Sequence, residues 1–349
     1  MLMVKDEKNK STMVSASSRM KGDVTLDVVA KIAGVSAITV SRAINKPEKV
    51  APETLERINR AIAKTGYVPN LLAGALASKS SKLIAAIVPS IANLVYAETI
   101  RLFSNRFRQA GYQVILGDSG YPEVLEEELV AAILTRRPDG ILLTGVDHSS
   151  ACRNLLLSAN IPIVETWDIT PSPLDIVVGF NHVKIGQEVA KYIKSKGFKS
   201  VGFIKADDAR AKRREQSTWE ALEEYGITDI QSTTVPVPSS MELGRVGTRR
   251  LLEEGLSNGV IFCSSDTLAQ GVLAELLYRN IRIPDDIAVI GFGDQVFAAH
   301  TYPPLTTVRI DRERIGREAV DALLARINGQ QVKKHIIDVG FTIVARSTA

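Results

Sequence analysis

The pattern of apolar and polar positions divides the chain into stretches with different periods. Residues 1–23 are polar and lack an apolar period, which is typical of a disordered leader. After this leader, apolar residues recur at helical spacing and predict three short helices, over residues 26–33, 37–44 and 52–65. Because these helices follow one another closely, we expect one small bundle over residues 24–69.

Local signals support the ends of these helices. Thr25 and Ser36 stand where an N-cap side chain accepts a hydrogen bond from the first helical turn. Gly34 and Gly66 follow the first and third helices, at positions that favour a left-handed backbone. We expect the bundle to bury the apolar side chains of Val28, Ile32, Val35, Val40, Ile44, Leu55, Ile58 and Ile62.

The next stretch, residues 70–82, has the character of a hinge and linker. Asn70 is placed to cap a helix over residues 71–77. A helix of two turns is marginal in isolation, so this one needs a partner in order to form. Residues 78–82 are polar and predict a short connection to the rest of the chain.

From residue 83 onward, runs rich in Val, Ile and Leu alternate with amphipathic stretches. Such runs are typical of buried parallel strands, and their alternation with helices indicates βαβ units. About eleven strands are too many for one comfortable sheet. We therefore predict an α/β body over residues 83–349, with two doubly wound parallel-sheet lobes like those of periplasmic binding proteins, preceded by the all-α bundle. Ligands bind at the carboxyl ends of such strands, which indicates a cleft between the lobes.

The predicted strands of the body include residues 83–88, 112–116, 140–143, 161–164, 176–179, 200–204, 259–262 and 288–291. The predicted helices include residues 96–110, 122–137, 182–196, 212–225 and 241–254.

The positive charge of the chain is concentrated at its start. The formal net charge is +4, but residues 1–82 carry 14 Lys or Arg against 7 Asp or Glu, a net of +7. The remaining 29 basic and 32 acidic residues give residues 83–349 a net charge of −3. This asymmetry favours a basic module that binds a polyanion, although a solvated basic tail would have the same composition.

Composition and residue spacing narrow the classes of protein to which the chain can belong. The apolar share of 45% and the charged share of 23% are ordinary for a globular protein. Cys152 and Cys263 match no metal-ligand spacing and favour a reducing compartment. The four histidines also lack metal or base spacing, so neither a metal nor a cofactor is expected. Without a long apolar run or a secretory signal, the chain is predicted to be soluble and cytoplasmic, with no membrane contact.

The strongest motif lies in residues 30–42. A glycine turn here joins two short helices, which is typical of a helix-turn-helix whose second helix enters the major groove. Arg42 is suited to pair with a guanine edge, and Ala37 or Ile38 to touch a thymine methyl group. Hydroxyl groups for phosphate contacts come from Ser36, Thr39 and Ser41. An ordinary helical hairpin is the alternative, which the clustered charge disfavours.

Several stretches share their residues with one known family. They are Thr25-Leu26-Asp27-Val28, Val35-Ser36, Thr39-Val40-Ser41-Arg42 with Asn45, and residues 65–70, 262–266, 283–286, 290–292 and 304–308. On these residues, the chain over 24–345 resembles the LacI/GalR family of bacterial transcription regulators. Within that family, residues 88–90 with 96–98, 174–180 and 338–342 look most like the gluconate-utilisation repressors.

The resemblance implies a repressor that binds a pseudo-palindromic double-stranded DNA operator as a homodimer. It also implies hinge helices that fold on DNA and place Leu76 in the minor groove as an apolar wedge; an ordinary tether is the alternative. Leu71 and Gly74 depart from the family, in which longer polar or basic residues are common at these positions. The DNA-binding candidates are Thr25, Ser36, Ala37, Ile38, Thr39, Ser41, Arg42, Asn45, Tyr67, Asn70 and Leu76.

The resemblance further implies a small effector, gluconate or a related sugar acid, bound between the lobes. Asp266 follows a strand and opens a helix, which suits a ligand hydroxyl acceptor as well as a capping residue. The arginine that the family places in the second lobe falls at Glu215 here, so Arg213, Arg214 or Arg210 would supply the positive charge, unless they form a solvated helix face. The effector-binding candidates are Asn93, Tyr96, Glu165, Trp167, Arg213 and Asp266, of which Asn93, Tyr96, Glu165 and Trp167 fit packing or rim roles equally well.

Other classes of function fit less well. Residues 117–120 are one residue short of a nucleophile elbow, and residues 291–293 lack the third glycine of a dinucleotide loop, so no enzyme activity is expected. A periplasmic sugar-binding protein would share the lobes but not the basic head. A regulator that responds to another sugar or sugar phosphate stays open as an alternative. An activator also stays open, because operator position decides the sign of regulation.

Overall fold

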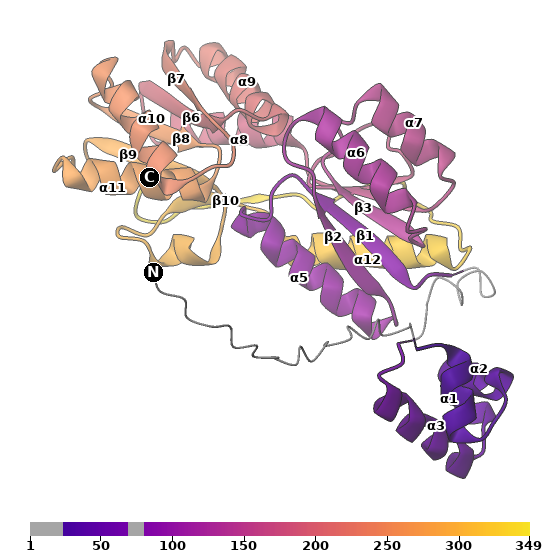
Figure 1. The fold of residues 1–349 in the computed structure, drawn as a ribbon. Helices are drawn as coiled ribbons and strands as arrows, with labels where there is room; N and C mark the ends of the chain where they lie inside the picture. The colour runs from indigo at the N-terminus through magenta and orange to yellow at the C-terminus, as the bar shows by residue number, and fades with distance from the viewer. Residues whose placement is uncertain (1–23, 69–79) are drawn as a thin grey trace, which may run out of the picture. The chain divides into compact units, whose positions relative to one another are not determined.

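The structure, a computed structural model, describes residues 24–68 and 80–349 (Figure 1). The chain divides into two compact units between Lys79 and Ser80, and each is described by itself. The predicted leader, most of the predicted hinge, and the candidates Asn70 and Leu76 lie outside the described residues.

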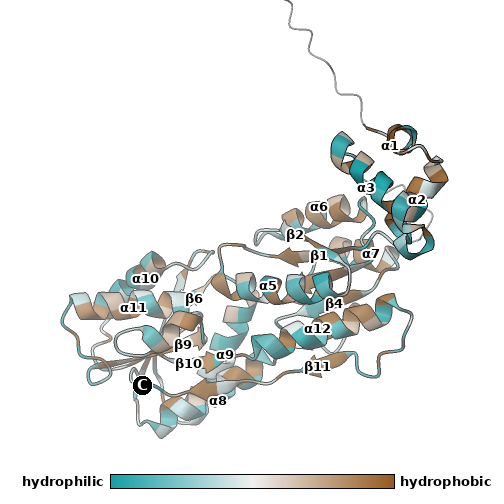
Figure 2. Ribbon diagram, turned by 90° about the horizontal axis from the view of Figure 1, so that it is seen from below, coloured by the Kyte–Doolittle hydropathy of each residue, from teal (hydrophilic) through white to brown (hydrophobic). Residues whose placement is uncertain are grey.

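The first unit is a bundle of three helices. It contains α1 (Leu26–Ala33), α2 (Ala37–Asn45), a short 3₁₀ turn η1 (Pro47–Lys49) and α3 (Pro52–Thr65). The predicted helical pattern is confirmed, including the helix ends at Gly34 (φ 65°) and Gly66 (φ 67°). In Figure 2, α3 is mainly hydrophilic in colour, because it buries only Ile58 and Ala61.

The buried face of α1 differs from the predicted one. Val28 and Ile32 are 42% and 48% exposed, whereas Val29, Ala30 and Ala33 are buried. Both sets have helical spacing, so periodicity alone does not choose between them. The small side chains of the alanines allow α1 to approach α2 and α3 closely, and this packing turns the larger Val28 and Ile32 outward.

The first lobe of the second unit is built on a six-stranded sheet of order β11-β5-β4-β3-β1-β2, parallel throughout. Its elements are β1 (Leu83–Val88), α5 (Leu94–Gln109), β2 (Gln113–Asp118), α6 (Glu123–Leu134), β3 (Gly140–Thr144), α7 (Ser150–Ser158), β4 (Ile163–Thr166), β5 (Ile176–Gly179), α12 (Arg312–Ile327) and β11 (Ile336–Asp338).

The second lobe is built on a sheet of order β12-β10-β9-β8-β6-β7, in which only β12 runs antiparallel. Its elements are α8 (His182–Ser195), β6 (Ser200–Ala206), α9 (Ala209–Glu224), β7 (Asp229–Val235), α10 (Met241–Glu253), β8 (Gly259–Cys263), α11 (Asp266–Tyr278), β9 (Ile287–Gly293), η2 (Val296–His300), β10 (Thr306–Arg309) and β12 (Thr342–Val344). The predicted class, two doubly wound α/β lobes, is confirmed.

The chain passes between the two lobes three times. It leaves the first sheet after β5, returns to it after β10 through α12, and leaves again between β11 and β12. Helix α12 (yellow in Figure 1) packs beside α5 in the first lobe, where Gly316 lies close against Leu102. The first lobe is therefore completed by residues from the end of the described chain.

Close packing of α8 on α9 positions the site described below. A Cβ atom on Gly186 of α8 would lie 1.9 Å from the Ser217 hydroxyl and 2.6 Å from the Arg214 carbonyl oxygen. Only glycine permits this approach, which brings the first turn of α8 beside the middle of α9. No helix among the described residues is long and apolar enough to cross a lipid bilayer.

Candidate functional site

The exposed face of α2 presents the residues expected to read DNA. Ile38 is 71% exposed, and Arg42 is exposed without an ion pair in the described part of the chain. Ser36 caps the helix, since its hydroxyl accepts a hydrogen bond of 3.3 Å from the Thr39 N–H and lies 2.9 Å from the Thr39 hydroxyl. An exposed arginine beside an exposed apolar side chain on a short helix is suited to the major groove.

The remaining DNA-binding candidates of the three-helix bundle are less exposed or have other roles. Ala37 and Tyr67 are half-buried against the bundle core. The amide of Asn45 donates to the Ser41 carbonyl at 2.9 Å, so it closes the end of α2. Thr25 stands at the start of α1, but the prediction that its side chain caps the helix is wrong, because the side chain makes no such hydrogen bond.

A cavity between the two lobes collects residues from both. It has a volume of about 60 Å³. The first lobe contributes Asn93, Val95, Tyr96, Tyr121 and Trp167, the crossing after β5 contributes Phe180 and His182, and the second lobe contributes Asp208, Arg210, Arg214, Ser239, Ser264, Ser265 and Phe292. The location agrees with the expectation that ligands bind outside the carboxyl ends of parallel strands.

Arg214 is the buried cation of this cavity. Its Nη1 donates to Nδ1 of His182 at 2.9 Å, its Nη2 donates to the Ser264 carbonyl at 3.0 Å, and its guanidinium carbon lies 3.8 Å from the Phe292 ring centre. Its Nε is buried without a hydrogen-bond partner among the described residues. Burial lowers the pKa of Arg214 to about 10, which still leaves it charged at neutral pH.

Arg210 stands one helical turn before Arg214 on α9. Its Nη2 donates to the Tyr96 hydroxyl at 2.7 Å, and its Nε lies 4.0 Å from the Asp208 carboxylate. Burial opposes its charge, but Tyr96 and the nearby carboxylates raise the pKa of Arg210 above its ordinary value. Together the two arginines direct positive charge into a largely aromatic cavity.

Three of the six effector candidates line this cavity, namely Asn93, Tyr96 and Trp167. Asn93 also caps α5, since its side chain accepts from the Val95 N–H at 3.1 Å. The Tyr96 and Trp167 rings meet edge to face at 5.7 Å. Trp167 has a φ of 70°, an uncommon value for a bulky residue, at the point where the chain leaves β4.

Arg213 and Glu165 lie outside the cavity lining. Arg213 forms ion pairs across the lobes, with Asp168 at 2.5 Å and with Asp147. Glu165 is fully buried in β4 and accepts from the Leu174 N–H at 2.7 Å. Their side chains therefore make contacts within the protein in this structure and do not line the cavity.

Asp266 is also outside the lining, because it is fully buried at the start of α11. Its carboxylate accepts from the Thr307 hydroxyl at 2.5 Å and from the Gln295 N–H at 2.6 Å. A Cβ atom on Gly291 of β9 would lie 2.3 Å from an oxygen of Asp266. The glycine therefore leaves the space that the carboxylate occupies. Burial raises the pKa of Asp266 to about 6 despite these hydrogen bonds.

The structure also separates the three arginines that the sequence left as alternatives. Arg210 and Arg214 are four residues apart and share the cavity face of α9, whereas Arg213 is rotated away from it. Glu215 faces β6 and β7, where it pairs with Lys205 at 2.5 Å. The sequence analysis did not place His182 in the site. Its position shortly after the predicted strand at residues 176–179 is the signal that indicates such a role, because ligands bind at the carboxyl ends of parallel strands.

A larger cavity of about 480 Å³ lies beside the crossings to α12 and β12. Three of its charged residues are already in ion pairs: Asp294 with Arg309 at 2.5 Å, and Arg312 with Glu98 at 2.8 Å. Since a ligand would have to compete with these pairs, the smaller cavity, with its unpartnered Arg214 Nε, is the better candidate site.

Comparison with known proteins identifies the family. Residues 25–70 match the family of bacterial regulatory proteins, lacI family, and residues 190–349 match a periplasmic binding protein-like domain. The HTH-type transcriptional regulator GntR of Pseudomonas aeruginosa is 36% identical over 352 residues, which cover 100% of both chains. This chain belongs to the LacI family. The GntR regulator of Escherichia coli K12 is 31% identical and covers 93% of this chain and 98% of its own.

Solved structures of LacI-family proteins share the fold. A transcriptional regulator of the family from Silicibacter pomeroyi matches with a TM-score of 0.87 at 31% identity, over 93% of this chain and 99% of that one. The lac repressor dimer bound to operator and an anti-inducer matches with a TM-score of 0.80 at 25% identity, over 94% and 99%. The LacI-family chain is thus a DNA-binding transcription regulator and not an enzyme, as predicted.

Proposed function

We propose that this LacI-family regulator represses genes for sugar-acid utilisation, and that gluconate or a related sugar acid bound between the lobes releases it from its operator. The observation that carries this proposal is the buried Arg214, whose Nε has no partner in the described residues and which lies beside Arg210 in the cavity. A carboxylate is the natural acceptor for such a pair of guanidinium groups.

The rest of the cavity suits the hydroxyl groups of a sugar acid. Asn93, Ser264 and Ser265 supply polar atoms, and Trp167 and Phe292 supply apolar faces. This combination of an apolar lining and a few placed polar groups is typical of small-molecule sites. The relatives named GntR support a regulatory role for this chain, and the resemblance to gluconate-utilisation repressors supports this class of effector.

Release from DNA requires that the effector binds one arrangement of the lobes more tightly than the other. Small-molecule pockets commonly enclose roughly 300–1,000 Å³, so the cavity of about 60 Å³ must widen to admit a six-carbon acid. We propose that this movement deprives the hinge segments, residues 71–77, of their paired geometry and withdraws Leu76 from the minor groove.

We further propose that the repressor works as a homodimer on a pseudo-palindromic operator in the cytoplasm. One three-helix bundle offers a single short helix, α2, to read the DNA. Two bundles related by a two-fold axis match the two halves of a palindrome. The operator-bound dimer of the lac repressor supports this assembly. Sedimentation of a monomer at micromolar concentration, with tight operator binding retained, would contradict it.

Calorimetry of the full chain with gluconate, 6-phosphogluconate, 2-ketogluconate, glucose and galactose tests the effector. We expect the acids to bind and the neutral sugars to bind weakly. Arg210→Gln should reduce gluconate affinity by tenfold or more, about 1.4 kcal/mol, because a charge-assisted hydrogen bond is lost. Lys212→Gln is the matched control: it removes one charge from the same helix, at an exposed ion pair with Asp207.

The outcomes separate the competing functions. Binding of neutral sugars alone, or equal losses in the two variants, would reject the sugar-acid effector but leave the regulator intact. Preference for a phosphorylated ligand would favour the sugar-phosphate alternative. Mapping the bound operator relative to the promoter distinguishes repression from activation.

A further inference from the structure

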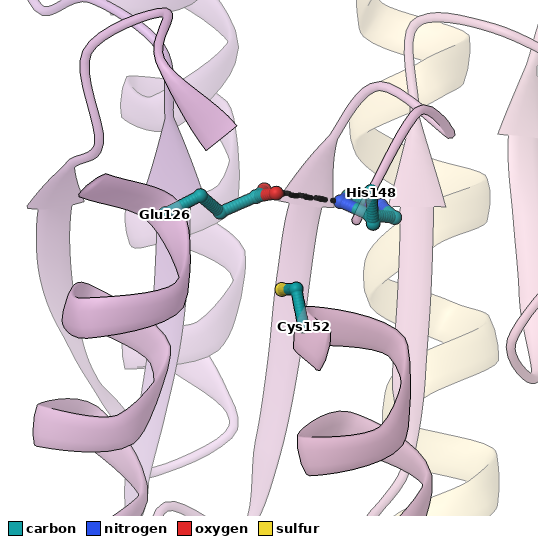
Figure 3. Close-up of side chains that lie close together, drawn as sticks. All are labelled: Glu126, His148 and Cys152. Atoms are coloured by element: carbon teal, nitrogen blue, oxygen red, sulfur yellow. Dashed lines mark hydrogen bonds and ion pairs between the residues drawn. The ribbon is translucent and has the colours of Figure 1, made fainter. Parts of the chain in front are cut away.

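Three side chains that can bind a metal ion converge in the first lobe, away from the effector cavity. Glu126 comes from α6, His148 from the loop after β3, and Cys152 from the first turn of α7, as Figure 3 shows. One ligand atom from each lies within 4.8 Å of the other two. Among residues 24–68 and 80–349, this is the one group of three such residues that meets this spacing.

The group is preorganised, and most of its surface is buried. Nδ1 of His148 lies 2.9 and 3.1 Å from the two carboxylate oxygens of Glu126. The His148 side chain is 1% exposed, and Cys152 is fully buried with a free thiol. The Cys152 N–H donates to the Ser149 hydroxyl at 3.1 Å, which fixes the first turn of α7 that carries the sulfur.

The other edge of the His148 ring lies against a second carboxylate, that of Glu165. Glu165 is fully buried, and its Oε1 has no hydrogen-bond partner among the described residues; neither has Nε2 of His148. These two atoms face each other at 3.6 Å, while the other oxygen of Glu165 is held by the Leu174 N–H. A histidine that binds a metal through one ring nitrogen usually donates a hydrogen bond to a carboxylate from the N–H of the other nitrogen.

We propose that Glu126, His148 and Cys152 form a binding site for one divalent transition metal ion of the Zn²⁺ class. Carboxylate oxygen, imidazole Nδ1 and thiolate are all ligands that Zn²⁺ takes, and water would complete a tetrahedral set. Binding releases the thiol proton of Cys152 and the Nδ1 proton of His148 to solvent. Glu126 and the thiolate then balance the charge of the ion, while Nε2 of His148 keeps its proton and donates a hydrogen bond to Glu165.

The ion would link α6, the loop after β3, and α7, which already meet through the His148–Glu126 pair and the hydrogen bond from the Ser149 hydroxyl to Glu127. Asp147, the neighbour of His148, forms the ion pair with Arg213 of the second lobe. A metal at this site therefore braces the loop that carries one half of an interlobe ion pair. Spacing along the chain does not reveal the site, because its ligands come from three separate elements.

The test is a titration of the full chain, purified without an affinity tag and stripped with a chelator, against Zn²⁺ and Co²⁺. We expect one ion per chain, and a Co²⁺ complex with a thiolate charge-transfer band and the intense visible absorption of tetrahedral cobalt. Cys152→Ser should abolish the charge-transfer band and weaken Zn²⁺ binding by roughly 100-fold or more. Glu165→Gln should keep the band but weaken binding by roughly 10- to 100-fold.

Cys263→Ser is the matched control, because it removes the other buried thiol, in β8. It should leave the metal affinity and the cobalt spectrum unchanged. Failure to bind either ion stoichiometrically, a cobalt spectrum without a thiolate band, or loss of the band in Cys263→Ser would overturn the proposal. If Cys152→Ser does not fold, the spectrum of the unmodified chain still decides the question.

Discussion

Nη1 of Arg214 donates a hydrogen bond of 2.9 Å to Nδ1 of His182, and this contact determines the state of the imidazole ring. Because a guanidinium only donates, Nδ1 must accept, so the ring proton resides on Nε2 and is donated to the Trp167 carbonyl at 3.0 Å. Burial and the charge of Arg214 lower the pKa of His182 well below its ordinary value. A neutral histidine thus joins the first lobe to α9 of the second.

The first prediction concerns this link. His182→Ala leaves one N–H of Arg214 and the Trp167 carbonyl buried without partners, and each such loss costs about 1–3 kcal/mol. We expect the free energy of unfolding to fall by about 2–6 kcal/mol, measured in urea by tryptophan fluorescence. His335→Ala, at an exposed histidine that contacts the Asp175 carbonyl, should cost less than about 1 kcal/mol. Equal losses would show that the link does not stabilise the protein.

The second prediction concerns the reading helix. Arg42→Ala should weaken binding to the specific operator by about 1–3 kcal/mol and leave the fold intact, because the side chain is exposed and unpaired in the described structure. Gel shifts on operator and random DNA measure this, and the loss on random DNA should be smaller. Arg60→Ala removes an equally positive, exposed side chain from α3 as a control. Equal loss on both DNAs would remove Arg42 from the reading role.

The third prediction concerns pH and Asp266. Its pKa is about 6 in the folded protein and about 3.9 when unfolded. Below pH 4 both states are protonated; as the pH rises towards 6 the unfolded chain ionises first, so the stability contributed by this group is lost. The loss amounts to about 3 kcal/mol and is complete above pH 6.

Asp266→Asn isolates this effect, because an amide can hydrogen-bond to both Thr307 and Gln295 but does not ionise. Denaturation of both proteins at pH 4.5 and pH 7 should show that the original chain loses more stability than the variant over this interval. A constant difference between the two would mean that Asp266 does not titrate with a raised pKa.

The fourth prediction concerns the contact between α8 and α9. Gly186→Ala places a methyl group against the Ser217 hydroxyl and the Arg214 carbonyl, so the helices must separate, at a cost of about 1–3 kcal/mol. Adding Ser217→Ala should recover only part of this loss, because the backbone carbonyl still clashes. Full recovery, seen in thermal unfolding, would mean that the side chain alone makes the contact tight.

Much of the fold could be predicted from the sequence, because buried parallel strands and capped helices leave strong local patterns. The site was harder to predict. Arg210 and Arg214 share a face because they are four residues apart, but nothing local shows that this face, rather than that of Arg213, meets the first lobe. Asp266 was expected to contact a ligand rather than to cap its helix. Ser265 is the cap of α11, and only the hydrogen bonds from Thr307 and Gln295 show that the oxygens of Asp266 are occupied. Glu126, His148 and Cys152 meet only after α6 and α7 pack.

The late position of α12 and β11 has a consequence for synthesis on the ribosome. Strand β5 leaves the exit tunnel long before β11, its parallel partner, has been translated. The face of α5 that carries Leu102 likewise has no packing partner until Gly316 of α12 has been made. Between these events the first lobe is a nascent chain with an open sheet edge and an uncovered apolar helix. This interval, rather than the finished protein, is where chaperone binding and aggregation should concentrate.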